Sequence, residues 1–134
     1  MPADENEVTA SVLVNAAPEA VYEYFIRPEA MVRWLGQFAR LDPRPGGELA
    51  IDMGGTPVRG RYQELEPPSR IVFTWGVAGS DELPPGSSTV EVRLSEVAGG
   101  TRVDIVHRDL PAHERPKHAA GWKRCLGLLA IAAG

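Results

Sequence analysis

The sequence has a single cysteine, Cys125, among its 134 residues. One cysteine cannot form an intramolecular disulfide, and it rules out Cys-x-x-Cys motifs. Because Cys125 lies among apolar residues, we expect a packed thiol in a reducing compartment and not a nucleophile. The N-terminus, Met-Pro-Ala-Asp-Glu-Asn-Glu, also lacks the basic and then apolar pattern of a secretory signal. These features predict a cytoplasmic protein.

Basic clusters and long apolar runs are missing as well. The formal net charge is −4, and the lysines and arginines are scattered along the chain. We therefore expect no nucleic-acid partner and no anionic membrane surface. Residues 125–134 carry no polar side chain, but ten helical residues cover roughly 15 Å, about half of a membrane span. No membrane span is expected.

The common catalytic and metal motifs are also absent. The chain has no Gly-rich phosphate loop, no Gly-x-Ser-x-Gly and no expected pair of inward carboxylates, since Asp104 has outward parity. His113 and His118 are five residues apart with Pro116 between them, whereas a zinc helix needs a spacing of four. We therefore predict no metal and no cofactor, and no local motif demands an enzyme.

What is present is one long amphipathic segment at the end of the chain, residues 111–134. The stripe formed by Trp122, Leu126, Leu129 and Ala133 has helical spacing, and Pro116 suits the first turn. Gly121 and Gly127 each cost about 1 kcal/mol inside a helix, so we expect close packing at both. The stripe needs a sheet to cover.

Earlier segments alternate with the period of strands, except for two short helices. The first strand covers residues 8–14, and Pro18 and Pro28 open helices that end near Gly36. Six more strands follow at residues 38–41, 48–53, 58–65, 70–75, 88–96 and 101–108, with an acidic loop at 76–86. This order predicts a single α+β domain, residues 1–134, in which a curved antiparallel sheet of about seven strands packs on the terminal helix.

Period two then sorts the strand residues between the two faces of the sheet. The apolar positions face the helix, and His107 continues the inward series of Val103 and Ile105. Charged residues take the opposite parity, where we expect a solvated face. They are Arg59, Arg61, Glu91, Arg93, Arg102, Asp104 and Arg108.

Several motifs together resemble a known family. They are residues 17–22 (Ala-Pro-Glu-Ala-Val-Tyr), 33–36 (Arg-Trp-Leu-Gly), 45–47 (Pro-Gly-Gly), the long stretch 60–75, 100–103 (Gly-Thr-Arg-Val) and 118–122 (His-Ala-Ala-Gly-Trp). With these motifs in this order, the sequence resembles the START-like (SRPBCC, Bet v 1-like) superfamily. Within it, the sequence is similar to the bacterial branch that resembles the activator of heat-shock protein 90 ATPase. The family's usual first-helix tryptophan is Tyr22 here. The resemblance implies a helix-grip fold, often with a cavity between sheet and helix.

This superfamily does not imply one activity. Our first hypothesis is binding of a hydrophobic or aromatic small molecule, lipid or polyketide-like, between sheet and helix. One alternative is a polyketide cyclase/aromatase-like or hydrolase-like enzyme, which would use lone polar groups to orient a chain and polarise a carbonyl. Another is co-chaperone stimulation of a chaperone ATPase, which we consider weaker because the chain leaves no room for a separate chaperone-binding domain.

Inward parity and the helix stripe predict seven ligand-binding residues. Small-molecule sites are commonly formed by aromatic residues with a few polar groups. Each such residue taken alone, however, is more often part of the hydrophobic core. His107 and His118 are more often hydrogen-bonded structural histidines than site residues; for His107 we expect backbone partners. The seven are Trp34, Met53, Tyr62, Phe73, Trp75, His107 and Trp122.

The end of the terminal helix predicts a protein contact. Leu128 and Ile131 continue the outer face that Arg124 begins, so they would meet water in a monomer. Exposed apolar patches usually mark protein contacts, and two-fold dimers are the commonest arrangement. The alternative is that strand edges or the 76–86 loop cover both residues within one chain.

Overall fold

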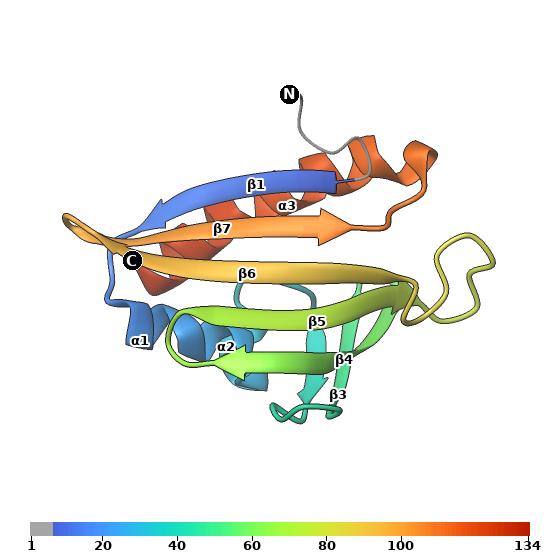
Figure 1. Cartoon of the computed structure of the whole chain (residues 1–134), viewed down its shortest axis with the longest axis horizontal. Helices are drawn as coiled ribbons and strands as arrows, with labels where there is room; N and C mark the ends of the chain where they lie inside the picture. Colours follow the sequence, from blue (N-terminus) through green and yellow to red (C-terminus); the bar gives the residue numbers. More distant parts are fainter. Residues whose placement is uncertain (1–6) are drawn as a thin grey trace.

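A single antiparallel sheet and one long helix dominate the computed structural model, which describes residues 7–134 (Figure 1). The strands are β1 (Glu7–Val14), β2 (Phe38–Leu41), β3 (Glu48–Met53), β4 (Thr56–Glu66), β5 (Arg70–Val77), β6 (Ser88–Val97) and β7 (Gly100–Arg108). The helices are α1 (Pro18–Tyr22), η1 (Glu23–Phe25), α2 (Pro28–Met31), η2 (Ala112–Glu114) and α3 (Arg115–Ala133). The predicted α+β helix-grip fold is confirmed.

The strand order determines which parts of the sheet the helices cover. It runs β1-β7-β6-β5-β4-β3-β2, with antiparallel neighbours throughout, so the first strand lies beside the last. Behind the sheet in Figure 1, α3 lies along β1 and β7, while α1 contacts β6 and β7 and α2 contacts β2. The inner face of the β3–β5 half is therefore left partly uncovered by α3.

Proline and glycine set the ends of the short helices, as the sequence predicts. Pro18 and Pro28 stand in the first turns of α1 and α2. Arg27 is extended because the residue before a proline is disfavoured in helical geometry. Gly36 has a φ of +82°, and a Cβ there would lie 2.5 Å from Cγ2 of Ile51. Only glycine fits where the chain turns from α2 into β2.

Tyr22 is buried in α1. Its hydroxyl is the buried side-chain polar atom that lacks a hydrogen-bond partner within residues 7–134. Burial also raises the pKa of Tyr22. An unpaired buried hydroxyl costs about 1–3 kcal/mol, so the tyrosine at this position is accommodated at some expense of stability.

The outer face of the sheet corrects one prediction. Glu91 has outward parity, as expected, but it is only 5% exposed and not solvated. Its carboxylate receives Arg70 Nε at 2.8 Å, Arg93 Nη2 at 2.8 Å and Arg108 Nη1 at 2.9 Å. These arginines pull the pKa of Glu91 below its usual range against the effect of burial, with the hydrogen bond from Arg70 as the largest cause.

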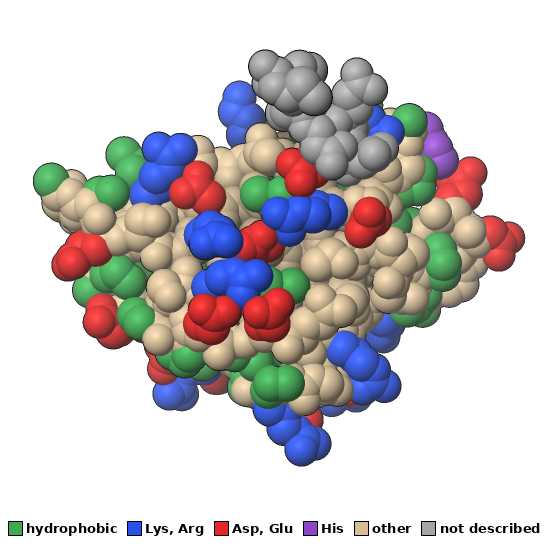
Figure 2. All heavy atoms as spheres, in the orientation of Figure 1, with side chains coloured by type: hydrophobic (Ala, Val, Ile, Leu, Met, Phe, Trp, Pro, Cys, Tyr) green, Lys and Arg blue, Asp and Glu red, His purple; other side chains and the backbone are tan. Residues whose placement is uncertain are grey.

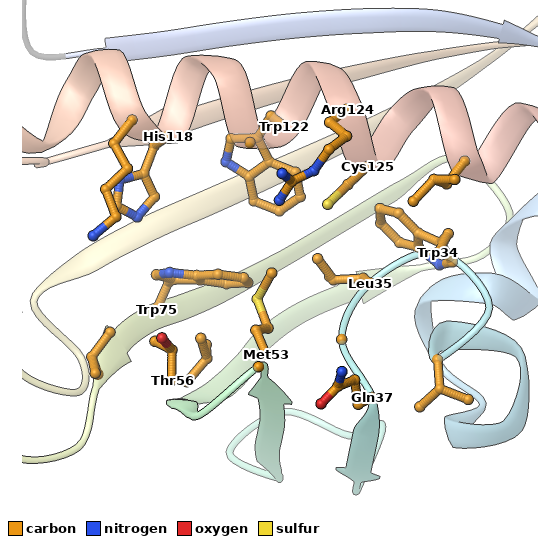
Figure 3. A pocket seen from close by; sticks show the side chains of 18 of the residues that line it. Trp34, Leu35, Gln37, Met53, Thr56, Trp75, His118, Trp122, Arg124 and Cys125 are labelled. Carbon is orange, nitrogen blue, oxygen red and sulfur yellow. The ribbon is translucent and has the colours of Figure 1, made fainter.

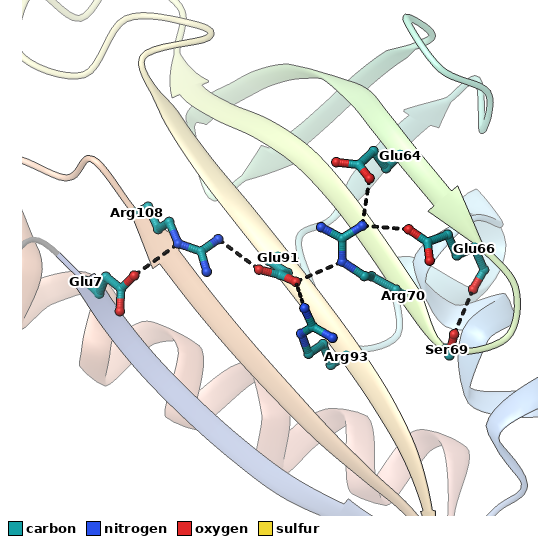
Figure 4. Close-up of polar contacts among 8 residues, drawn as sticks. All are labelled: Glu7, Glu64, Glu66, Ser69, Arg70, Glu91, Arg93 and Arg108. Atoms are coloured by element: carbon teal, nitrogen blue, oxygen red, sulfur yellow. Dashed lines mark hydrogen bonds and ion pairs between the residues drawn. The ribbon is translucent and has the colours of Figure 1, made fainter. Parts of the chain in front are cut away.

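The arginines around Glu91 extend the ion pairs across five neighbouring strands (Figure 4). Arg70 also binds Glu64 and Glu66, and Arg108 also binds Glu7. Figure 2 shows acidic and basic side chains intermingled over the middle of this face. Parity alone missed the burial of Glu91 because three long side chains, one from β6 itself and one from each adjacent strand, close over it.

We predict that Glu91→Gln lowers the free energy of unfolding by about 1–3 kcal/mol, because a partly desolvated carboxylate that pairs with three arginines is lost. Urea denaturation measures the change. Asp104→Asn is the matched control, since Asp104 pairs with Arg102 on the same face but both side chains are exposed. The control should cost less than about 1 kcal/mol. Equal costs in the two variants would contradict the special role of Glu91.

Candidate functional site

An open pocket of about 580 Å³ lies between α3 and the β3–β5 half of the sheet (Figure 3). Three parts of the chain line it: residues 32–37 after α2, the strands β3 to β5, and one face of α3. The α3 residues that line the pocket recur at helical spacing from Lys117 to Leu128, and Glu114 of η2 precedes them. The predicted cavity between sheet and helix is therefore present.

Four of the seven predicted site residues line this pocket: Trp34, Met53, Trp75 and Trp122. Trp75 comes from the sheet and Trp122 from α3, and their ring centroids are 5.3 Å apart. Trp34 comes from the segment after α2, and its indole N–H donates to the Tyr24 carbonyl at 3.0 Å. Leu35, Val58 and Leu128 add aliphatic wall. The walls are predominantly apolar and aromatic.

The other three predicted residues lie behind the walls. Tyr62 is fully buried, and its hydroxyl donates to the Phe25 carbonyl at 2.8 Å beneath η1. Burial raises the pKa of Tyr62 far above its usual value. Phe73 is 1% exposed and packs between the rings of Tyr62 and Trp75. His107 is also fully buried. These residues support the pocket without lining it.

His107 belongs to a chain of buried hydrogen bonds that joins α3 to the sheet. The indole N–H of Trp122 donates to His107 Nδ1 at 3.0 Å. His107 Nε2 is therefore the protonated nitrogen of the neutral ring, and it donates to Ser88 Oγ at 2.8 Å. The Ser88 hydroxyl donates in turn to the Trp75 carbonyl at 2.7 Å. The histidine is hydrogen-bonded, as we expected of a structural one, but its partners are side chains and not the backbone.

Burial lowers the pKa of His107 to about 3, with His118 as a second cause. A proton on Nδ1 would also face the indole N–H of Trp122, and two donors cannot share a hydrogen bond. The protonated imidazolium is therefore incompatible with this chain of hydrogen bonds. His107 therefore holds the pocket wall in position as a neutral ring.

Several polar groups in the pocket have no hydrogen-bond partner within residues 7–134, and two of them belong to aromatic rings. These two are the indole N–H of Trp75 and Nε2 of His118. His118 donates its other ring proton, from Nδ1, to the Glu114 carbonyl at 2.9 Å, so Nε2 is left as an acceptor. Figure 3 shows Trp75 and His118 on opposite walls, with Gln37 and Thr56 toward the strand ends. A ligand could use these groups for orientation.

The helix glycines correct another prediction. We expected close packing at Gly121 and Gly127, but a Cβ built at either position meets nothing within 4 Å. Gly121 lines the pocket, so the space beside it belongs to the pocket. Gly127 faces solvent. No close contact therefore requires glycine at either position. Gly121 leaves the middle of the pocket open because it has no side chain.

A cluster of three polar residues lies beside the mouth of the pocket, where the 76–86 loop meets the start of α3. Nε2 of His113 is 2.7 Å from Oε2 of Glu82, and a carboxylate oxygen of Glu114 lies nearby. The ligand atoms of these three residues lie within 4.8 Å of one another. Glu82 and His113 are exposed, and we assign no metal to them.

The fold and the cavity define a class of protein, the START-like helix-grip proteins. Comparison with known proteins gives the same class. A family profile described as "Activator of Hsp90 ATPase homolog 1-like protein" matches residues 15–134. The chain belongs to this family. No curated protein matches the sequence significantly. Within residues 7–134, no helix combines the length and the apolar character needed to cross a membrane.

Solved structures give the same fold. Protein CV1439 from Chromobacterium violaceum is 27% identical, with a TM-score of 0.80 over 97% of this chain and 98% of that one. CalU16 from Micromonospora echinospora is 25% identical, with a TM-score of 0.78 over 96% of this chain and 76% of that one. DynU16, from the dynemicin biosynthetic locus, is 24% identical, with a TM-score of 0.82 over 94% of this chain. The match spans 46% of DynU16.

We predict that the buried neutral His107 makes stability depend on pH below neutrality. Its folded pKa of about 3 lies below the unfolded value of 6.5, so only the unfolded chain takes up this proton between those pH values. Stability is therefore lost as the pH falls through this window. At pH 5 the loss from this residue is about 2 kcal/mol relative to pH 7.5.

Urea denaturation of wild type and His107→Gln at pH 7.5, 6 and 5 measures this effect. The variant should be less stable at pH 7.5 but should lose less stability on acidification. The range above pH 5 limits interference from carboxylates. The same pH dependence in both proteins would contradict the assignment.

Proposed function

We propose that this protein binds a hydrophobic or aromatic small molecule in the pocket between α3 and the sheet, without a metal or cofactor. The observation that carries the proposal is an open space of about 580 Å³ with three tryptophans and Met53 in its walls. Ligand pockets commonly have volumes of about 300–1,000 Å³, mostly apolar walls and a few polar groups. The unpaired groups on Trp75 and His118 supply such polar groups.

The ligand class that fits these walls is a lipid or a polyketide-like aromatic. Flat rings can stack against Trp75 or Trp122, and flexible chains can lie against Met53 and Leu35. In this proposal Trp34, Met53, Trp75 and Trp122 contact the ligand. Tyr62, Phe73 and His107 act indirectly, because they hold those side chains in place. The cytoplasmic location stays a prediction from the sequence.

The enzyme and co-chaperone alternatives are tested separately. Glu114 is the only carboxylate among the described residues that line the pocket, so a paired-carboxylate mechanism has no support inside it. A cyclase-like or hydrolase-like activity would have to use groups such as His118 and would disappear in His118→Ala. Co-chaperone activity requires stimulation of a chaperone ATPase by the purified protein. Nothing in the pocket favours either over binding.

We also propose that the chain forms a homodimer through the end of α3. Leu128 is 45% exposed and Ile131 is 79% exposed. Neither the strand edges nor the 76–86 loop covers them, so the intrachain alternative does not hold. Because Leu128 also lines the pocket, a partner on this patch would lie beside the pocket mouth.

We predict that filling the pocket from α3 abolishes binding without unfolding the protein. Gly121→Leu places a side chain in open pocket space, whereas Gly127→Leu adds the same side chain to the solvent face of the same helix. A thermal-shift screen with fatty acids, flavonoids and polyketide-like aromatics would identify ligands, and calorimetry would compare the three proteins. Wild type and Gly127→Leu should bind, and Gly121→Leu should not. If no compound binds wild type, or if Gly121→Leu binds equally well, the pocket is not the site.

The dimer is tested with a variant outside the pocket. Wild type should sediment as a dimer at tens of micromolar, and Ile131→Lys as a folded monomer, because a charge replaces an apolar contact. Leu13→Lys is the matched control, since Leu13 is 67% exposed on β1. It should stay dimeric. Monomeric wild type, or equal dissociation of both variants, would reject this interface.

A further inference from the structure

We infer that the ligand is an amphipathic anion, a hydrophobic molecule with one carboxylate, and that Lys117 and Arg124 select it by charge at the pocket mouth. This inference rests on the proposed function, because it names the chemistry of the ligand for the same pocket. It starts from the rim cations Lys117 and Arg124, which have no ion-pair partner within residues 7–134.

Most arginines in the described part of the chain form ion pairs. They are Arg27, Arg40, Arg44, Arg59, Arg70, Arg93, Arg102 and Arg108. Lys117 and Arg124 line the pocket and have no ion-pair partner within residues 7–134. Cations without an ion-pair partner therefore line the pocket, while most arginines on the outer face of the sheet are paired with carboxylates.

The opposite side of the mouth is also basic. Arg33 comes from the segment after α2, where it donates to the Tyr24 hydroxyl at 3.2 Å and its guanidinium lies 5.8 Å from the centre of that ring. These contacts orient the side chain without neutralising its charge. Cations thus flank the pocket from both walls, α3 on one side and the α2–β2 segment on the other.

The acidic groups around the pocket do not cancel this charge. Glu114 is the one carboxylate among the described lining residues; its side chain is 17% exposed and lies 3.7 Å from Nδ1 of His118. Three lining cations against Glu114, with Glu82 beside the mouth, still leave a local positive excess, although the whole chain carries −4. A concave site with apolar walls concentrates such a field, which favours anions over neutral molecules.

The arrangement of the rim suits a single acid group on an apolar body. Lys117 and Arg124 are separated by two turns of α3, about 10 Å along its axis. Between them the pocket surface is formed by Gly121 and Trp122, with Trp75 opposite. In Figure 3 Arg124 and Cys125 descend from α3 on the same side as Trp122. The apolar part of a ligand can occupy this space while its carboxylate stays at the solvent-exposed edge of the pocket, close to the cations.

The experiment compares probes that differ in charge and little else. The first pair is 1-naphthylacetate and 1-naphthylacetamide, and the second is decanoate and 1-decanol. Calorimetry at low salt measures each dissociation constant for wild type, Lys117→Gln/Arg124→Gln and Lys123→Gln. Lys123→Gln is the matched control, because it removes one exposed charge from the same helix at a position outside the pocket.

We expect wild type and Lys123→Gln to bind each acid about tenfold more tightly than its neutral partner, because a charge-assisted hydrogen bond is added. The double variant should bind the two members of a pair within about twofold, and added salt should reduce the preference in wild type. If acids and neutral partners bind wild type equally, the charge selection is wrong while the proposed function stands. If the double variant keeps the preference, Lys117 and Arg124 are not the selector. If no probe binds, the proposed function fails together with this inference.

Discussion

The structure depends on a mismatch in width between the sheet and the helix that covers it. Seven strands at about 4.8 Å spacing make a sheet roughly 29 Å across, whereas a helix with its side chains is only about 10–12 Å wide. One helix cannot bury so wide an apolar face. The protein meets this constraint by curving the sheet, by placing α3 along β1 and β7, and by covering other parts with α1, η1 and α2. The pocket is the space that these elements leave between them.

The sequence was sufficient to predict the order and nature of the elements. Alternation in β1 and β3, the prolines at 18 and 28, and the stripe through Trp122 are local signals, and each produced the element expected from it. Local signals cannot tell how far across the sheet a residue lies. Tyr62 and Phe73 pair on neighbouring strands and both face inward, yet η1 covers one of them and ring neighbours enclose the other.

Polar partners were harder to predict because they come from distant strands. Val90 is the β6 neighbour of His107. The side chain of His107, however, donates to Ser88, two residues away on β6, and accepts a hydrogen bond from Trp122 on α3. Glu91 is surrounded by arginines from β5, β6 and β7. Such contacts depend on register, which period-two reasoning does not provide. The unpaired rim cations Lys117 and Arg124 had no sequence signal at all, since a missing partner is visible only in three dimensions.

The position of the tryptophans has a spectroscopic consequence. The chain has three tryptophans, and all three line the one cavity described above. Indole emission therefore reports on that cavity and is silent about the outer face of the sheet. Moreover, Trp34 and Trp122 donate their indole N–H groups within the protein, while the indole N–H of Trp75 has no hydrogen-bond partner within residues 7–134. A ligand that enters the pocket would therefore change the environment of all three indoles, and a polar ligand atom could give the Trp75 N–H the hydrogen-bond partner that the other two already have.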